Sequence, residues 1–303
     1  MQKPVLVAGG CSFTDPNNWQ YFSKSHGVNE IKAWPQVLAD IIKDKHGIDY
    51  KVINTGRGGA SLSKSIDRIQ RAVFSEERNI KPHPENLIVL GLTDWWREYS
   101  THTEIDFNPA VHYMYQLKDS IEKGEHPLVS LPRHISNNPE DQERALRDCE
   151  RMGIENFARD WLPNYYVWGE YRKRRIHYAF QQIYNVITMA KALGYKVLIY
   201  QLLYPLPPHE HYLERFGLEN PLKQSMDAWL IDHMHEVFLY DVLKKEESII
   251  GFPFVKVLGG YNYEASINYQ NEKYCIAPND GHPNQLGHEL IAKEFYNAWK
   301  NTE

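Results

Sequence analysis

Residues 5–14 read Val-Leu-Val-Ala-Gly-Gly-Cys-Ser-Phe-Thr, an apolar run that ends in small residues and a serine. A short apolar run bounded by glycines is typical of a buried strand. The glycines permit the tight turn that exposes a nucleophile above the sheet of an α/β enzyme. The pattern therefore makes Ser12 a candidate nucleophile. The alternative is that Ser12 or Thr14 only caps a helix by bonding its free backbone N–H groups.

A candidate base lies near the other end of the chain. Residues 278–284 read Pro-Asn-Asp-Gly-His-Pro-Asn, and Gln-Leu-Gly-His follows directly. A histidine on an exposed loop beside a carboxylate is well placed to accept a proton, which here points to His282 with Asp280. As an alternative, the prolines and the glycine serve turn formation alone.

Two further stretches combine an apolar strand with a small or polar ending. Residues 52–61 read Val-Ile-Asn-Thr-Gly-Arg-Gly-Gly-Ala-Ser, and residues 86–94 read Asn-Leu-Ile-Val-Leu-Gly-Leu-Thr-Asp. In a parallel sheet, ligands bind at the carboxyl ends of the strands. We therefore expect Ser12, Gly59, Thr93 and His282 to meet at this edge.

Strand and helix patterns alternate along the chain, which predicts βαβ units and a mainly parallel sheet of about five strands between two layers of helices. The expected strands are 5–8, 50–54, 87–90, 195–200 and 254–257. The expected helices begin at 33, 61, 174 and 286, and glycines at positions 47 and 194 end the first and third of them.

These four blocks, in this order, resemble the SGNH (GDSL-like) hydrolase family. The match consists of Gly-Cys-Ser-Phe-Thr, Asn-x-Gly-x-x-Gly from Asn54 to Gly59, Gly-x-Thr-Asp from Gly91 to Asp94, and the final Asp-x-His-Pro. With Trp34-Pro35 and the late Gly-His, the combination looks most like the divergent SGNH-like proteins of bacteriophages. The resemblance implies a three-layer α/β/α fold with a flavodoxin-like arrangement of strands.

The resemblance also implies roles for single residues. Ser12 is expected to be the nucleophile and His282 the base, and the oxyanion donors are expected to be the N–H groups of Ser12 and Gly59 and a side chain in the third block. Asn54 and Asp94 belong to the same blocks as further binding positions, although a carboxylate at the end of a strand favours a structural role for Asp94, as a cap of the next turn or an ion-pair partner of Arg97.

Two positions depart from the family pattern. The third block usually supplies an Asn amide, and this chain has Thr93, whose hydroxyl is shorter. The acid usually stands three residues before the histidine, where this chain has Asn279, so Asp280 is the expected orienting carboxylate. Because such a carboxylate fixes the histidine tautomer and stabilises the imidazolium, its displacement bears directly on activity.

The segment from Trp95 to about Glu170 interrupts the alternation of strands and helices. It is polar, long and rich in aromatic residues, and long irregular segments in compact domains are usually functional. We expect a single domain, 1–303, with this segment as a cap over the site, in which Trp95 and Trp96 line the substrate entrance. Tryptophans that pack the insertion internally are an equally good account.

Composition restricts the classes of function. The chain has 303 residues, 42% hydrophobic residues and a net charge of −5, which indicates a globular protein and gives no support for nucleic-acid binding. No apolar run is long enough for a membrane span. Three scattered cysteines favour a reducing cytosol over a disulfide framework. Pairs such as His209/His211 and His233/His235 lack a fixed third ligand, so we expect neither metal nor cofactor.

The sequence therefore predicts a cytoplasmic serine esterase or deacylase that acts on acyl groups of a carbohydrate. The main alternative is a non-catalytic SGNH-like binding or structural module, including a component of a phage virion beside other phage structural proteins. Acyl transfer to a sugar would use the same residues.

Overall fold

The computed structural model describes residues 3–20, 23, 27, 29–93, 95, 98–100, 105–107, 169–202, 233–252, 272–277 and 280–302. The chain forms two compact units. The first comprises 1–94, 179–205 and 238–303, and the second comprises 95–178 and 206–237. Most of the expected cap, 95–170, lies outside the described residues, so its role over a single domain stays a prediction.

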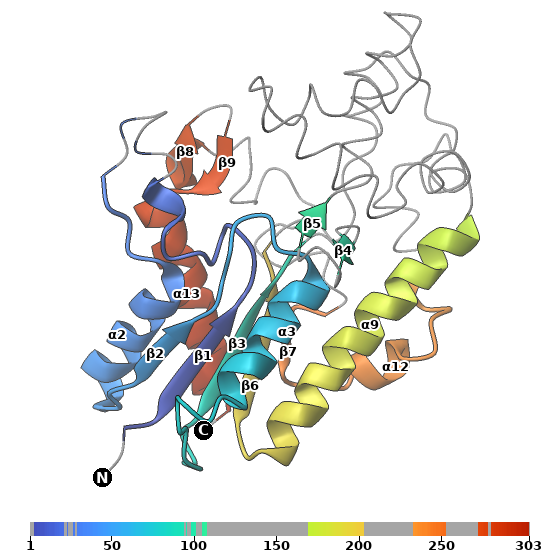
Figure 1. The fold of residues 1–303 in the computed structure, drawn as a ribbon, viewed down its shortest axis with the longest axis horizontal. Helices are drawn as coiled ribbons and strands as arrows, with labels where there is room; N and C mark the ends of the chain where they lie inside the picture. The colour runs from blue at the N-terminus through green and yellow to red at the C-terminus, as the bar shows by residue number, and fades with distance from the viewer. Residues whose placement is uncertain are drawn as a thin grey trace, which may run out of the picture. The chain divides into compact units, whose positions relative to one another are not determined.

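The first unit is built on a five-stranded parallel sheet, which confirms the predicted α/β class (Figure 1). The strand order is β2-β1-β3-β6-β7. All residues of β1 and β3 are buried, as expected where helices cover both faces of a parallel sheet. The strands are β1 (Val5–Gly9), β2 (Lys51–Asn54), β3 (Leu87–Leu92), β6 (Lys196–Gln201) and β7 (Ile249–Ile250).

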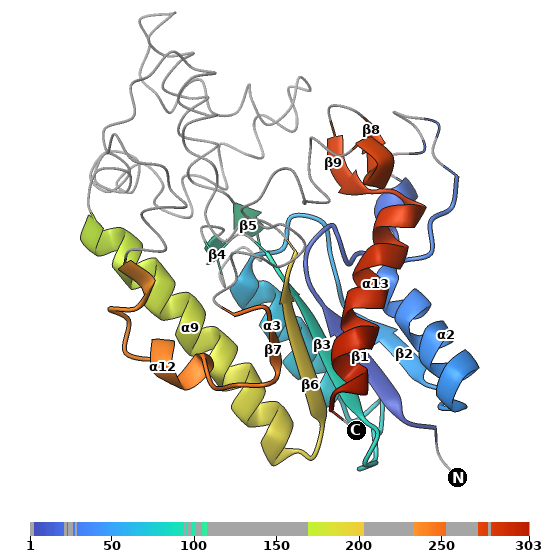
Figure 2. The same ribbon diagram turned by 180° about the vertical axis from the view of Figure 1, so that it is seen from behind.

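The helices lie in two layers. Figures 1 and 2 show α2 (Trp34–His46) and α13 (Gln285–Lys300) on one face of the sheet, and α3 (Leu62–Val73) and α9 (Gly169–Ala192) on the other. As predicted, α2 and α9 end at glycines, since Gly47 (φ 72°) and Gly194 (φ 73°) adopt the left-handed conformation that glycine tolerates.

A large core cluster joins α2 and α13 to the sheet. The Trp34 ring of α2 stacks on the Phe295 ring of α13, with centroids 4.3 Å apart and an interplanar angle of 6°. Tyr200 of β6 meets Phe295 edge to face at 5.5 Å. Because both helices bury their apolar faces here, the segment that follows His282 is part of the main core.

Shorter elements complete the described residues. The fifth strand of the sheet is β7, whereas the expected strand 254–257 lies outside the described residues. A hairpin of β8 (Cys275–Ala277) and β9 (Asp280–Pro283) follows the 3-10 helix η3 (Glu272–Tyr274). A helix α12 spans Tyr240–Leu243. In the second unit β4 (Glu98–Ser100) pairs with β5 (Ile105–Phe107). None of the helices described here is long and apolar enough to cross a membrane.

Candidate active site

The turn after β1 presents Ser12 at the carboxyl edge of the sheet. Gly10 has φ 151°, and a Cβ there would lie 2.2 Å from Thr14 Oγ1, so only glycine fits. The backbone N–H groups of Thr14 and Asp15 both donate to the carbonyl of Cys11, at 2.9 and 3.0 Å. The apolar run thus ends in a closed turn that fixes the position of Ser12.

His282 lies within hydrogen-bond distance of Ser12. Its Nε2 is 2.9 Å from Ser12 Oγ, although 270 residues separate the two in sequence. The Phe13 ring stands 5.5 Å from the imidazole, tilted by 55°. Ser12 is 8% exposed. The pair has the geometry of a nucleophile beside its general base.

The hairpin that carries His282 is fixed to α13 by Asn284. The Asn284 side chain caps the helix by accepting from the Gly287 N–H at 3.0 Å. Its Nδ2 also donates to the carbonyls of Lys273 and Cys275, both at 3.0 Å. One asparagine therefore holds both the hairpin and the helix that flank the candidate base. Sequence reasoning quoted this residue without assigning it a role.

The loop after β2 is fastened to the Ser12 turn. Asn54 Nδ2 donates to the carbonyl of Thr14 at 2.7 Å, and Asn54 Oδ1 accepts from the Gly56 N–H at 2.9 Å. The Asp15 carboxylate accepts from the Gly58 N–H at 2.8 Å. Asn54 therefore holds the backbone of the site. The contribution of Asp15 was missed because a single aspartate after a turn carries no distinctive pattern.

Gly59 offers an open approach to the backbone. Its φ is 77°, and no heavy atom lies within 4 Å of the position that a Cβ would take. A Cβ on the neighbouring Gly58 would lie 4.0 Å from Ser12 Cβ, which places this loop beside the nucleophile. Among the described residues, neither the Ser12 N–H nor the Gly59 N–H donates a hydrogen bond.

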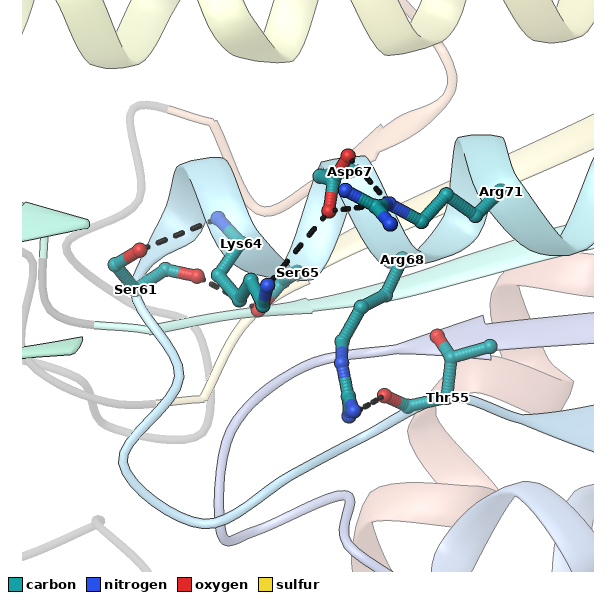
Figure 3. A network of polar contacts seen from close by, with 7 residues as sticks. All are labelled: Thr55, Ser61, Lys64, Ser65, Asp67, Arg68 and Arg71. Atoms are coloured by element: carbon teal, nitrogen blue, oxygen red, sulfur yellow. Dashed lines mark hydrogen bonds and ion pairs between the residues drawn. The ribbon is translucent and has the colours of Figure 1, made fainter. Parts of the chain in front are cut away.

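Helix α3 holds the far end of this loop (Figure 3). Ser61 Oγ accepts from the Lys64 N–H at 3.2 Å as the helix cap. One turn further on, Arg68 Nη1 donates to the carbonyl of Thr55 at 3.1 Å. Figure 3 shows Arg68 pointing from the helix toward Thr55, while Arg71 pairs with Asp67 along the helix surface. The loop that contains Gly59 is thus anchored at both ends.

The third block is described only in part. Thr93 is 0% exposed, its carbonyl accepts from Gln201 Nε2 at 3.0 Å, and its Oγ1 has no hydrogen-bond partner within the described part of the chain. Asp94 and Trp96 lie outside the described residues. In the second unit, Trp95 is 1% exposed and its carbonyl accepts from Arg175 Nη2 at 2.6 Å.

The structure describes the backbone of Asp280, the expected orienting carboxylate, but not its side chain. The backbone of Asp280 pairs with Ala277 in the hairpin, two residues before His282, but its side chain and Asn279 lie outside what the structure describes. Asp280 as the partner of His282 stays a prediction.

A second histidine is buried close to the first. His288 of α13 is 5% exposed, and its Nδ1 accepts from the backbone N–H of Trp34 at 3.2 Å. Burial and, to a lesser degree, the nearby His282 lower the pKa of His288 to about 3. His288 is therefore neutral at physiological pH, because both causes disfavour its protonated form.

In the described ranges, no group of three or more His, Cys, Asp or Glu side chains could hold a metal ion. His209 and His211 lie outside those ranges. The chain matches no protein-family model, and a search of curated proteins finds no relative.

Proposed function

We propose that this protein is a serine hydrolase of SGNH type that cleaves carboxylic esters, with acyl groups of a carbohydrate as the expected substrate. The observation that carries the proposal is the 2.9 Å contact between Ser12 Oγ and His282 Nε2 at the carboxyl edge of the parallel sheet. The order of the four motifs supports the family, and the aromatic segment after the third motif supports the sugar preference.

In the proposed reaction, His282 takes the proton of Ser12 as the hydroxyl oxygen attacks the ester carbonyl. The N–H groups of Ser12 and Gly59, uncommitted among the described residues, donate to the oxyanion of the tetrahedral intermediate. His282 then gives its proton to the leaving alcohol, which departs from the acyl-enzyme. Water, activated by the same histidine, releases the acid and restores Ser12.

Covalent labelling tests this proposal directly. A fluorophosphonate probe reacts with an activated serine, and mass spectrometry maps the modified residue. We expect one modification, at Ser12, that is absent in Ser12→Ala and reduced at least a hundredfold in His282→Ala. His235→Ala replaces an exposed histidine of the second unit and serves as the matched control, with unchanged labelling. No labelling of the folded wild-type protein would contradict the proposal.

A non-catalytic SGNH-like module, including a phage virion component, is the second candidate. The threonine at 93 and the asparagine at 279, where the family has an amide and an acid, favour it. Hydrolysis of p-nitrophenyl acetate separates the two candidates. An enzyme loses most turnover in His282→Ala and a smaller part in Asp280→Ala, whereas a module has no turnover for these changes to remove.

A further inference from the structure

Trp34 and His288 lie beside the candidate site without taking part in the proposed chemistry. Trp34 is the first residue of α2 and is fully buried, and His288 stands in the first turns of α13. Figure 2 shows the two helices side by side on one face of the sheet. Both residues belong to motifs, Trp-Pro and Gly-His, to which the proposed mechanism gives no role.

The two N–H donors of Trp34 go to two different parts of the site. Its indole Nε1–H donates to Thr14 Oγ1 at 3.2 Å, and its backbone N–H donates to His288 Nδ1 at 3.2 Å. Thr14 belongs to the same closed turn as Ser12. His288 belongs to the helix that the Asn284 cap ties to the hairpin of His282. Trp34 thus donates one hydrogen bond to the turn that carries Ser12 and one to the helix that is joined to the hairpin of His282.

The backbone bond has a clear physical reason. The first N–H groups of a helix have no acceptor within the helix, and the residue before Trp34, Ala33, offers no side-chain cap. His288 Nδ1 supplies an acceptor for this buried donor. Leaving such a donor without a partner would be costly.

We propose that Trp34 and His288 are positioning residues, which hold the Ser12 turn and the His282 hairpin at the separation that the Ser12–His282 hydrogen bond requires. The proposal rests on the proposed function for its catalytic consequence. Its structural content, one tryptophan tying two segments together, is independent of that function.

The charge state of His288 suits this role. Because its Nδ1 accepts a hydrogen bond, the ring proton resides on Nε2. Burial and the neighbouring His282 lower the pKa of His288 to about 3. Nδ1 consequently remains an acceptor at the moment when His282 becomes protonated in the proposed reaction. A protonated Nδ1 could not accept the backbone N–H of Trp34, so this hydrogen bond requires the neutral form of His288.

Paired substitutions separate positioning from simple packing. Trp34→Phe keeps the ring on Phe295 and the backbone N–H but removes the indole donor to Thr14. His288→Leu removes the acceptor for the backbone N–H, and His288→Asn places a carbonyl oxygen near the position of Nδ1. Trp299→Phe is the matched control, because the indole Nε1 of this fully buried residue has no hydrogen-bond partner among the described residues.

We expect Trp34→Phe and His288→Leu to lower kcat and the fluorophosphonate labelling rate of Ser12 at least tenfold, with KM changed less than twofold. His288→Asn should recover the larger part of that loss, and Trp299→Phe should show none. Thr14→Val should reproduce Trp34→Phe, and the double variant should be no worse than either single one, because both remove the same bond. Wild-type kcat and labelling in folded Trp34→Phe and Thr14→Val would overturn the proposal.

An NMR experiment tests the positioning role without depending on catalytic turnover. With ¹⁵N-histidine-labelled protein, NMR reports the tautomer of His288 and the Nε2 signal of His282. We expect the Nε2–H tautomer of His288 from pH 5 to pH 8, and a displaced His282 Nε2 signal in Trp34→Phe and Thr14→Val but not in Trp299→Phe. If wild-type protein shows no labelling, the proposed function fails. The NMR measurement still tests whether Trp34 holds the Ser12 turn and the His282 hairpin together. An unchanged His282 Nε2 signal in Trp34→Phe and Thr14→Val would overturn the positioning role of Trp34.

Discussion

At the scale of single residues, the buried hydroxyl of Thr93 bears on the proposed oxyanion site. Its hydroxyl is fully buried and has no hydrogen-bond partner among the described residues. An unsatisfied buried hydroxyl costs about 1–3 kcal/mol of stability. A hydroxyl that donates its hydrogen bond only to a transition state has no partner in the resting protein, so that bond lowers the reaction barrier but does not stabilise the fold.

Thr93→Val therefore has opposite expected effects on activity and stability. The valine keeps the shape and removes the hydroxyl, so we expect kcat to fall roughly 10²–10³-fold, as for other oxyanion donors. The free energy of unfolding should stay equal or rise by about 1 kcal/mol. Ester kinetics and urea unfolding measure the two effects. Unchanged kcat would assign Thr93 a structural role. Thr93→Asn, which introduces the amide that the SGNH motif carries at this position, is the companion variant.

His288 gives a prediction about pH and stability. Burial lowers its pKa to about 3 in the folded protein, whereas the unfolded chain has the ordinary value near 6.5. Between these values the unfolded state binds one more proton, so stability falls as the pH falls, by at most about 1.4 kcal/mol per pH unit.

Urea unfolding at pH 7 and pH 5 tests this dependence. The stability advantage of wild-type protein over His288→Asn should shrink by about 2 kcal/mol between the two pH values. His177→Gln, which replaces an exposed histidine of α9, is the matched control. A constant difference between wild type and His288→Asn would mean that His288 titrates normally in the folded protein.

At the scale of elements, the turn after β1 depends on Gly10. Any Cβ at this position would meet Thr14 Oγ1 at 2.2 Å and the backbone carbonyl of Gly91 at 3.0 Å, in addition to a φ of 151°. Gly47, the cap of α2, has φ 72° but open space around a Cβ. Gly10 is therefore required because there is no space for a Cβ, whereas Gly47 is favoured only because of its left-handed backbone conformation.

We expect Gly47→Ala to cost about 1–2 kcal/mol of stability, the penalty of a left-handed alanine, and to leave Ser12 labelling intact. Gly10→Ala should cost more and should abolish labelling, because the turn must open to admit the methyl group. Thermal unfolding and fluorophosphonate labelling measure both. Normal labelling in Gly10→Ala would show that the Ser12 turn is not the arrangement that reacts.

The elements that sequence reasoning found are those with a strong local pattern. The apolar runs of β1 and β3 and the glycine ends of α2 and α9 lie within a few residues of their predicted positions. The sequence offered no signal for β7, because this strand contains only Ile249 and Ile250, and the expected strand 254–257 lies outside the described residues. A two-residue strand has no period, and its pairing with β6 depends on tertiary packing.

The reacting pair of the candidate site could be predicted from the sequence, but the hydrogen bonds that hold the site could not. The family resemblance brought Ser12 and His282 together, and the structure places them 2.9 Å apart. The bonds of Trp34 to Thr14 and His288 were not predictable, since they join residues 20 and 254 positions apart without any periodic pattern. Supports of this kind become visible only when the chain is folded.

At the scale of the whole molecule, the candidate base belongs to the same core that holds the sheet together. His282 lies three residues before α13, and α13 contributes Phe295 and Trp299 to the cluster it shares with Trp34 of α2. A hairpin tied to a core helix should not open independently of that core. We therefore expect the reactivity of Ser12 and the fold of the first unit to be lost together.

Phe295→Ala tests this coupling. Removing a fully buried ring that stacks on Trp34 at 4.3 Å and meets Tyr200 at 5.5 Å leaves a cavity that should cost about 3–5 kcal/mol of stability. The urea concentration that halves Ser12 labelling and the midpoint of unfolding followed by circular dichroism should coincide in wild type and should shift downward together in the variant. Phe74→Ala, which removes an exposed ring at the end of α3, should shift neither. If labelling disappeared well below the unfolding midpoint, the hairpin of His282 would open as a separate local unit, and the rigid link from α13 to the site would be wrong.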